Sequence, residues 1–280
     1  MSYQDFRPRS FQLLPLVIKY LIIINVIVFL TTEAVKMQLG IDLTNYLGLH
    51  YYKSELFRPH QFITYMFMHG GFLHIVMNMF ALWMFGNALE NVWGPKRFLI
   101  FYLVTGVGAG LVYMAYQGYN FHRIEEAIAV YSSAPSDMDF SALLKTHFPF
   151  ALQNDQILSF LSSWSENPAH NELYIQQSLT LVNEWVNEIQ NIPTVGASGS
   201  VYGVLVGFGM LFPNTILYFL FLPFPIKAKY MVLGYIAIEV YYTIQNNPGD
   251  NVAHLAHLGG VLFAYVLIKM WNKNNRENFY

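Results

Sequence analysis

The stretch VGASGSVYG, residues 195–203, stands directly before the apolar run VLVGFGMLF at residues 204–212. It places three glycines and two serines at the start of a segment whose composition suits lipid. A loop or a close helix-packing face would explain the glycines. A reactive hydroxyl at the start of a membrane helix would explain the glycines together with a serine. The surrounding sequence has to decide between these interpretations.

The composition is that of a membrane protein. Of the 280 residues, 55% are hydrophobic, 17% aromatic and 11% charged, whereas soluble domains are about 25% charged. The chain has no cysteine, which excludes disulfides, thiolate chemistry and cysteine-ligated zinc. The net charge of −2 gives no reason to expect a nucleic-acid partner.

Six stretches have the character of membrane helices, since a hydrocarbon core of about 30 Å takes about 20 apolar residues. They are residues 14–36, 71–92, 97–117, 197–213, 228–245 and 253–271. The first is long for a signal-peptide core and lacks a small-residue cleavage site, so we expect it to be retained. We therefore predict an all-α polytopic membrane protein with six transmembrane helices.

The distribution of lysine and arginine along the chain predicts its orientation in the membrane. With a cytoplasmic N-terminus, ten of the fifteen basic residues lie on the cytoplasmic side, and the other five are spread over much longer outside loops. The positive-inside rule then places both terminal segments, residues 1–13 and 272–280, in the cytoplasm. From the compact six-helix core we expect an integral, multi-pass protein of a bacterial inner membrane.

Residues 119–194 differ from the rest, with no long apolar run and with nine acidic against two basic side chains. Apolar residues at alternating spacings of four and three predict an amphipathic helix near the end of this segment. These residues are Ile175, Leu179, Val182, Val186 and Ile189. We predict a small, mostly helical insertion on the outer face, between a first part at 14–118 and a second at 195–271. It could serve as a lid, a substrate-docking surface or a spacer.

Polar side chains inside the predicted membrane helices are functional candidates, because they are costly to place in lipid. His74 and Asn78 are four residues apart and share a helix face, and His69 stands just before that helix. His254 and His257 lie three residues apart in the last helix. A single histidine of this kind more often joins two helices by a hydrogen bond than performs chemistry.

Small residues predict that the fourth and sixth helices pack closely. Gly199, Gly203 and Gly207 recur at every fourth position. Small residues also share the helix face of His257, namely Ala253, Gly260 and Ala264. Two such faces allow the backbones of two helices to approach, which would bring Ser198 near His257.

A serine becomes a nucleophile when a base takes its proton, and a neutral imidazole is the usual base near pH 7. Ser198 would begin a helix after Gly196, so its own N–H would be free to stabilise an oxyanion. The side chains of His74 and Asn78 can add further donors. Together these groups predict acyl transfer at Ser198 with His257 as the base.

A carboxylate for a complete triad is not identified by the sequence. Glu90 and Glu239 are the intramembrane candidates, but neither has a spacing that ties it to His257. We therefore predict a Ser198–His257 dyad and interpret Glu239 as structural. His254 is also expected near Ser198, but only His257 has a glycine three residues later.

These motifs resemble those of the rhomboid family of intramembrane serine proteases. The resemblance rests on Gly196-Ala197-Ser198-Gly199, on Ala256-His257 with Gly260, and on His74-x-x-x-Asn78. It covers six helices in the expected order, roughly residues 14–118 and 195–271. It implies a rhomboid-like bundle that cleaves transmembrane protein substrates within the lipid bilayer, without a metal, ATP or a small-molecule cofactor.

The resemblance also implies roles for individual residues. Ser198 matches the nucleophile, His257 the general base, and His74, Asn78 and the Ser198 N–H the oxyanion site. Neighbouring positions match supporting residues of the family: Tyr202 the aromatic that stacks on the catalytic imidazole, His69 a loop histidine near the water path, Glu90 a structural glutamate and Arg58 the arginine of a Trp-Arg loop signature. The chain departs from the pattern at Phe57, which replaces that tryptophan, and at Ala264, which replaces a glycine.

Other interpretations explain less of the sequence. A non-catalytic rhomboid-like protein that binds membrane proteins for quality control is the main alternative, although such relatives usually lack the serine or the histidine. A b-haem protein with His74 and His257 as axial ligands would leave the Gly-Ala-Ser-Gly motif without a role. A transporter with a broken fourth helix predicts inverted repeats, which we do not find. A zinc intramembrane protease would need His-Glu-x-x-His, which is absent.

Overall fold

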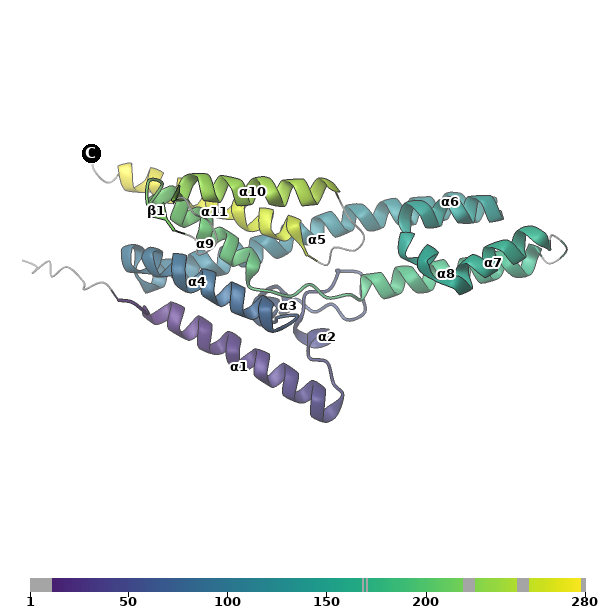
Figure 1. Ribbon diagram of the computed structural model, residues 1–280, viewed down its shortest axis with the longest axis horizontal. Coiled ribbons are helices and arrows are strands. Elements are labelled where there is room, and N and C mark those ends of the chain that lie inside the picture. Colours follow the sequence, from purple (N-terminus) through teal and green to yellow (C-terminus); the bar gives the residue numbers. More distant parts are fainter. Residues whose placement is uncertain (1–11, 168, 170, 219–224, 246–251, 278–280) are drawn as a thin grey trace, which may run out of the picture.

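The computed structural model describes residues 12–167, 169, 171–218, 225–245 and 252–277. This part of the chain is almost entirely helical (Figure 1). Its one sheet is a pair of two-residue antiparallel strands, β1 (Ile216–Leu217) and β2 (Ile226–Lys227). The protein is an all-α polytopic membrane protein, as the composition predicts.

Each of the six predicted membrane segments coincides with a helix. These are α1 (Leu16–Leu39), α4 (Phe72–Trp93), α5 (Pro95–Ser133), α9 (Ser198–Leu211), α10 (Ala228–Gln245) and α11 (His254–Glu277). In the described part of the chain, four helices are long and apolar enough to cross a membrane: α1, α4, α5 and residues His254–Asn272 of α11. The apolar helix α9 has only 14 residues, or about 21 Å, so it spans part of the hydrocarbon core.

Helix α9 is the centre of the bundle and packs against α4, α5, α10 and α11. Ten of its fourteen residues are buried. A Cβ added to Gly260 of α11 would lie only 1.9 Å from the Gly199 carbonyl oxygen, so the two backbones touch there. The predicted close packing of these helices is confirmed at this crossing.

The glycine stripe of α9 does not face α11 along its whole length, contrary to the sequence-based expectation. A Cβ on Gly203 would meet Thr105 of α5, and one on Gly207 would meet Leu89 of α4. Only the first glycine of the stripe lies against α11. Helix α5 therefore occupies most of the space that the glycines leave open.

Helix α1 is attached to the bundle mainly through its N-terminal half. The carboxylate of Glu90, at the end of α4, accepts hydrogen bonds of 2.9 Å from the N–H groups of both Val17 and Ile18. It thereby satisfies the free donors of the first turn of α1, which no side-chain N-cap covers. From this attachment α1 diverges from the other helices toward its C-terminal end (Figure 1).

The loop between α1 and α4 contains three short helices: α2 (Thr44–Leu47), α3 (Gln61–Thr64) and the 3₁₀-helix η1 (Tyr65–Phe67). The Arg58 guanidinium donates to the carbonyl oxygens of Glu55 and Phe57 at 2.9 and 2.7 Å. Phe57 itself packs edge-on against Phe62. Arg58 thus fastens a turn of this loop to its own backbone.

The insertion is helical and has its own core. It consists of α6 (Asp137–His147), the 3₁₀-helix η2 (Pro149–Gln153), α7 (Asp155–Glu166) and α8 (Asn171–Gln190). Helix α5 continues into it without a break, so the predicted boundary at residue 118 falls inside a helix. The amphipathic helix predicted over 175–189 is α8, whose Val182 is buried in the insertion core beside Phe148 and Trp164.

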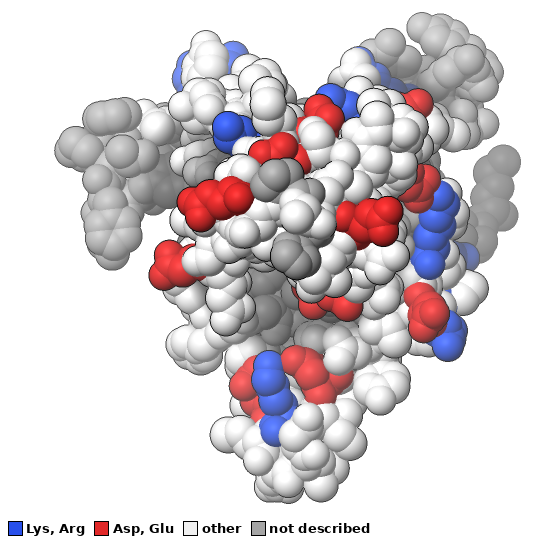
Figure 2. Space-filling view, turned by 90° about the vertical axis from the view of Figure 1, so that its right-hand side faces the viewer, with Lys and Arg blue, Asp and Glu red and all other residues white. Residues whose placement is uncertain are grey.

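The insertion projects from one end of the bundle (Figure 1). Figure 2 looks at the molecule from that end and shows acidic side chains scattered over it, with basic ones between them. The excess of negative charge is therefore distributed and forms no single acidic patch on this face.

Candidate active site

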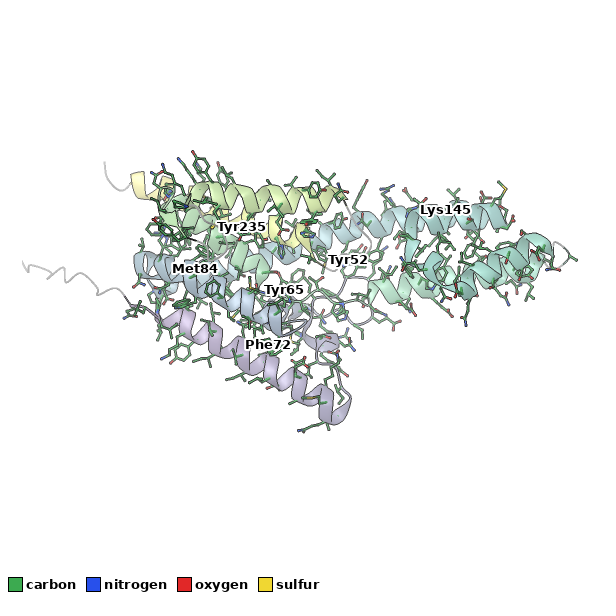
Figure 3. The ribbon with its side chains drawn as sticks, viewed as in Figure 1. Tyr52, Tyr65, Phe72, Met84, Lys145 and Tyr235 are labelled. Atoms are coloured by element: carbon green, nitrogen blue, oxygen red, sulfur yellow. The ribbon has the colours of Figure 1, made fainter. Side chains whose placement is uncertain are left out.

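The approach to Ser198 is held by backbone hydrogen bonds. Thr194 and Leu49 exchange a pair of bonds at 2.8 and 2.9 Å, and the Gly196 N–H donates to the Tyr65 carbonyl oxygen at 3.0 Å. Figure 3 labels Tyr65, which lies in the interior of the bundle at the start of α9. These bonds fix the chain on both sides of the turn that leads into α9.

Gly196 is required by the geometry of that turn. Its φ of +133° is a conformation that L side chains rarely adopt. A Cβ at this position would also lie 3.0 Å from the His74 ring. After this turn Ser198 is the first residue of α9, so its N–H has no acceptor within the helix.

His257 brings an imidazole to the Ser198 hydroxyl. Its Nε2 lies 2.8 Å from Ser198 Oγ, although the two residues are 59 positions apart. His257 is in the first turn of α11 and only 8% of it is exposed. The Tyr202 ring stacks on the imidazole at 4.3 Å and 11°, because a residue four after Ser198 projects from the same face of α9.

A buried carboxylate lies on the other side of the imidazole. Glu239 of α10 is 4% exposed, and its Oε2 is 3.0 Å from His257 Nδ1 and 2.6 Å from His254 Nδ1. Its Oε1 accepts a hydrogen bond from the Tyr202 hydroxyl. No sequence spacing ties a carboxylate to His257, but the fold brings Glu239 next to its Nδ1.

The residues of the predicted oxyanion site lie on α4. The His74 ring faces Gly196, next to the start of α9. The Asn78 side chain is 6% exposed, and its Nδ2 donates to the His74 carbonyl oxygen at 2.9 Å. The structure thus places the imidazole of His74 beside the Ser198 turn, with Asn78 one helical turn along α4.

His69 lies between this group and an external cavity. Its ring is 5.1 Å from that of His74, edge to face, and the residue is 3% exposed. It lines a cavity of about 230 Å³ that is also lined by Thr32 and Lys36 of α1. Both ring nitrogens of His69 are buried, and neither has a hydrogen-bond partner among the described residues.

Comparison with models of protein families shows to which family this chain belongs. The family model described as "Rhomboid domain" matches residues 55–131 and 158–273. The chain belongs to the rhomboid family. The matched ranges include the Ser198 turn, α4 and the His257 helix, and they leave out residues 132–157 of the insertion.

Several curated proteins are similar to this rhomboid chain. An uncharacterised mitochondrial rhomboid protein of Schizosaccharomyces pombe is 26% identical over 219 residues, which cover 76% of this chain and 52% of the relative. The mitochondrial RHOMBOID-like protein 12 of Arabidopsis thaliana is 23% identical over 220 residues, 79% of this chain and 48% of the relative. The chain thus spans about half the length of these two relatives.

A shorter similarity links the rhomboid chain to a protein whose name states an activity. The rhomboid protease GluP of Bacillus subtilis is 33% identical over 57 residues, 20% of this chain and 11% of the relative. The relatives therefore include bacterial and organellar rhomboid proteins.

Within the part of the chain that the structure describes, Glu239, His254 and His257 form a group with the side chains of a metal site, since their ligand atoms lie within 4.8 Å of one another. Two of the three pairs are already in direct contact at 2.6 and 3.0 Å. Ligands of a tetrahedral zinc ion would be about 3.3 Å apart. The observed spacing instead fits a carboxylate that joins two imidazoles directly.

The contact of Glu239 with His257 could have been predicted in part from the sequence. Helices α10 and α11 are consecutive and joined by a short connection, which makes them antiparallel neighbours. Both residues lie within two turns of the helix ends that this connection joins. Spacing within one helix could not show the contact, but register across the helix pair could have.

Proposed function

We propose that this rhomboid protein is an intramembrane serine endopeptidase that cleaves transmembrane segments of membrane-protein substrates. The observation that carries the proposal is the 2.8 Å contact between Ser198 Oγ and His257 Nε2 at the start of a buried helix. A hydroxyl in this contact can pass its proton to the imidazole while the oxygen attacks a carbonyl carbon. The family supports the same kind of chemistry.

The proposed reaction has two halves. Ser198 Oγ forms a bond to the scissile carbonyl carbon, and His257 Nε2 takes the hydroxyl proton. The C–N bond then breaks, and His257 gives that proton to the leaving amine. Water attacks the acyl-enzyme with His257 again as the base, which releases the new carboxyl end and restores the Ser198 hydroxyl.

The oxyanion of each tetrahedral intermediate needs donors that are already in place. In this proposal the donors are the Ser198 N–H and the side chains of His74 and Asn78. The substrate reaches them from the lipid, past α10, after local unwinding of its helix. The second substrate, water, reaches them from the outer face past His69, which lines a cavity of about 230 Å³.

The proposed setting is a bacterial inner membrane, with both termini in the cytoplasm. The positive-inside distribution of lysine and arginine supports the orientation. The reaction as proposed uses no metal ion and no small-molecule cofactor. Because the match covers only about half the length of these relatives, the choice of substrate is part of the proposal as well.

Cleavage of a type I transmembrane reporter in detergent tests this function, with a fluorophosphonate probe on the same samples. We expect wild type to cleave and to be labelled, and Ser198→Ala to lose both, with a rate lower by about 10⁴-fold or more. Ser200→Ala is the matched control, because Ser200 is two residues away and donates to the Tyr102 carbonyl oxygen instead. It should keep its label and its activity.

Three results are informative. Cleavage that survives Ser198→Ala, with contaminating proteases excluded, contradicts the assignment of the nucleophile. Folded wild type that neither cleaves nor reacts with the probe points to the non-catalytic binding and quality-control role. Labelling without cleavage shows a reactive serine and directs the search to other membrane substrates.

A further inference from the structure

We propose that Glu239 is a positioning residue for His257 and completes a Ser198–His257–Glu239 triad inside the bundle. The inference rests on the proposed function, and it replaces a two-residue mechanism by one in which a buried carboxylate orients the base. The three side chains come from three helices, α9, α11 and α10, so no local motif connects them.

The two nitrogens of His257 face different partners. Nε2 lies 2.8 Å from Ser198 Oγ, and Nδ1 lies 3.0 Å from Glu239 Oε2. A carboxylate at Nδ1 favours the tautomer that carries its proton there. Nε2 is then left with a free lone pair, as a base toward Ser198 must have.

The alignment of this contact matters as well as its length. His257 Nδ1 is close to Oε2, but the angle falls short of a hydrogen bond. Hydrogen bonds within a catalytic group often tighten only when substrate binds.

Glu239 is held in place from several sides. The Tyr202 hydroxyl donates to Oε1, and His254 Nδ1 lies 2.6 Å from Oε2. The Tyr242 ring stacks on His254 at 5.1 Å and 16°. With His257, three polar groups converge on one buried carboxylate, which is how a buried negative charge is sustained.

The charges and titratable groups around His257 come from four of the helices packed on the site. They are His74 on α4, Tyr202 on α9, Glu239 and Tyr242 on α10, and His254 on α11. Glu239 supplies the negative charge among them. When Ser198 passes its proton to His257, the new imidazolium therefore forms 3.0 Å from its counter-charge.

This arrangement separates the roles of the two intramembrane glutamates. Glu90 binds the first turn of α1 and lies at the far end of α4 from His74. Glu239 binds the candidate base. Glu90→Gln is therefore a matched control for Glu239→Gln, since both remove a buried carboxylate charge with almost no change in shape.

The experiment uses the full chain in detergent, with the reporter cleaved over a range of pH. We expect Glu239→Gln to lower kcat by about 10²–10⁴-fold with little change in KM, the upper figure being that of the equivalent change in a soluble triad. Loss of the counter-charge makes the imidazolium harder to form, so the acid limb of the kcat/KM profile should move to lower pH. Glu239→Asp should regain part of kcat, and Glu90→Gln should keep the wild-type profile.

A second readout does not depend on cleavage. In ¹⁵N-histidine NMR spectra, with the His257 signal assigned by its loss in His257→Gln, wild type should show one tautomer protonated at Nδ1. Glu239→Gln should show a mixture. If folded wild type neither cleaves the reporter nor reacts with the fluorophosphonate probe, the proposed function fails, while the NMR result still decides whether Glu239 orients His257.

Some outcomes would overturn the triad. One is a Glu239→Gln protein with wild-type kcat and an unchanged acid limb. Another is a Glu239→Gln protein whose tautomer and pH profile match wild type while only its melting temperature falls, which would make Glu239 structural. If Glu239→Gln does not fold, Glu239→Asp serves instead, and a wild-type rate, pH profile and tautomer in that variant contradict the proposal.

Discussion

The contact of Gly260 with Gly199 gives the sharpest test of how packing sets the active-site geometry. In Gly260→Ala the new Cβ would lie 1.9 Å from the Gly199 carbonyl oxygen, while real Cβ contacts essentially never fall under 3.0 Å. Backbone on both sides cannot yield locally, so α9 and α11 must separate by about 1 Å. Ser198 and His257 lie on these two helices, and their 2.8 Å contact would open with them.

The expected size of the effect follows from this displacement. A shift of about 1 Å between reacting groups costs roughly 10²-fold in rate. Overpacking of a close helix contact also costs about 1–3 kcal/mol of stability. We therefore expect Gly260→Ala to cleave the reporter about 10²-fold more slowly, to react more slowly with the fluorophosphonate probe, and to melt at a lower temperature.

Gly234→Ala is the matched control, because it is also a glycine inside a membrane helix and a Cβ there meets nothing within 4 Å. It should keep full activity and gain up to about 1 kcal/mol from helix propensity. A Gly260→Ala protein with wild-type kcat and melting temperature would refute the argument that backbone contact between α9 and α11 holds the site together.

Three further predictions concern other parts of the molecule. Glu90→Gln removes a charged acceptor from the first turn of α1 and should lower the free energy of unfolding by about 1.5–3 kcal/mol with kcat unchanged, as thermal melting and turnover will show. Trp164→Ala leaves a cavity in the insertion core and should lower the free energy of unfolding of the insertion by about 3–5 kcal/mol. In limited proteolysis, the insertion should then be cut before the bundle. Hydrogen bonds from Thr44 and Lys36 hold the pKa of Asp42 at about 2. The ionised Asp42 side chain therefore stabilises the fold fully above its ordinary pKa, and this stabilisation is lost as the pH falls through 2. A titration of the Asp42 carboxyl group near pH 4 would contradict this.

The sequence predicts the helices of the bundle well because their signal is local. Apolar length marks α1, α4 and α11, and the structure begins each of them within two residues of the expected position, although α11 continues to Glu277 instead of ending at residue 271. The continuation of α5 beyond residue 118 was missed because the apolar run stops there. A weaker pattern persists: Ile124, Ile128 and Tyr131 recur every fourth or third residue and pack on the insertion core.

The candidate site was predictable to the extent that it depends on motifs. Ser198 and His257 meet as the small residues around them indicate. The orientation of the glycine stripe toward α5, and the approach of Glu239 to His257, depend on how each helix is rotated about its axis. That rotation is set by packing against several neighbours at once, and no spacing within one helix records it.

The 39 residues of α5 form one unbroken helix from the bundle to the insertion, about 58 Å long. It touches α9 at Gly199, the residue after Ser198, where Ala109 packs against the glycine, and its far end contributes to the insertion core. A rigid helix of this length pivots about that contact. A small tilt of α5 at this contact becomes a larger displacement at its far end, so a movement of α5 against α9 should be measurable as a displacement of the insertion.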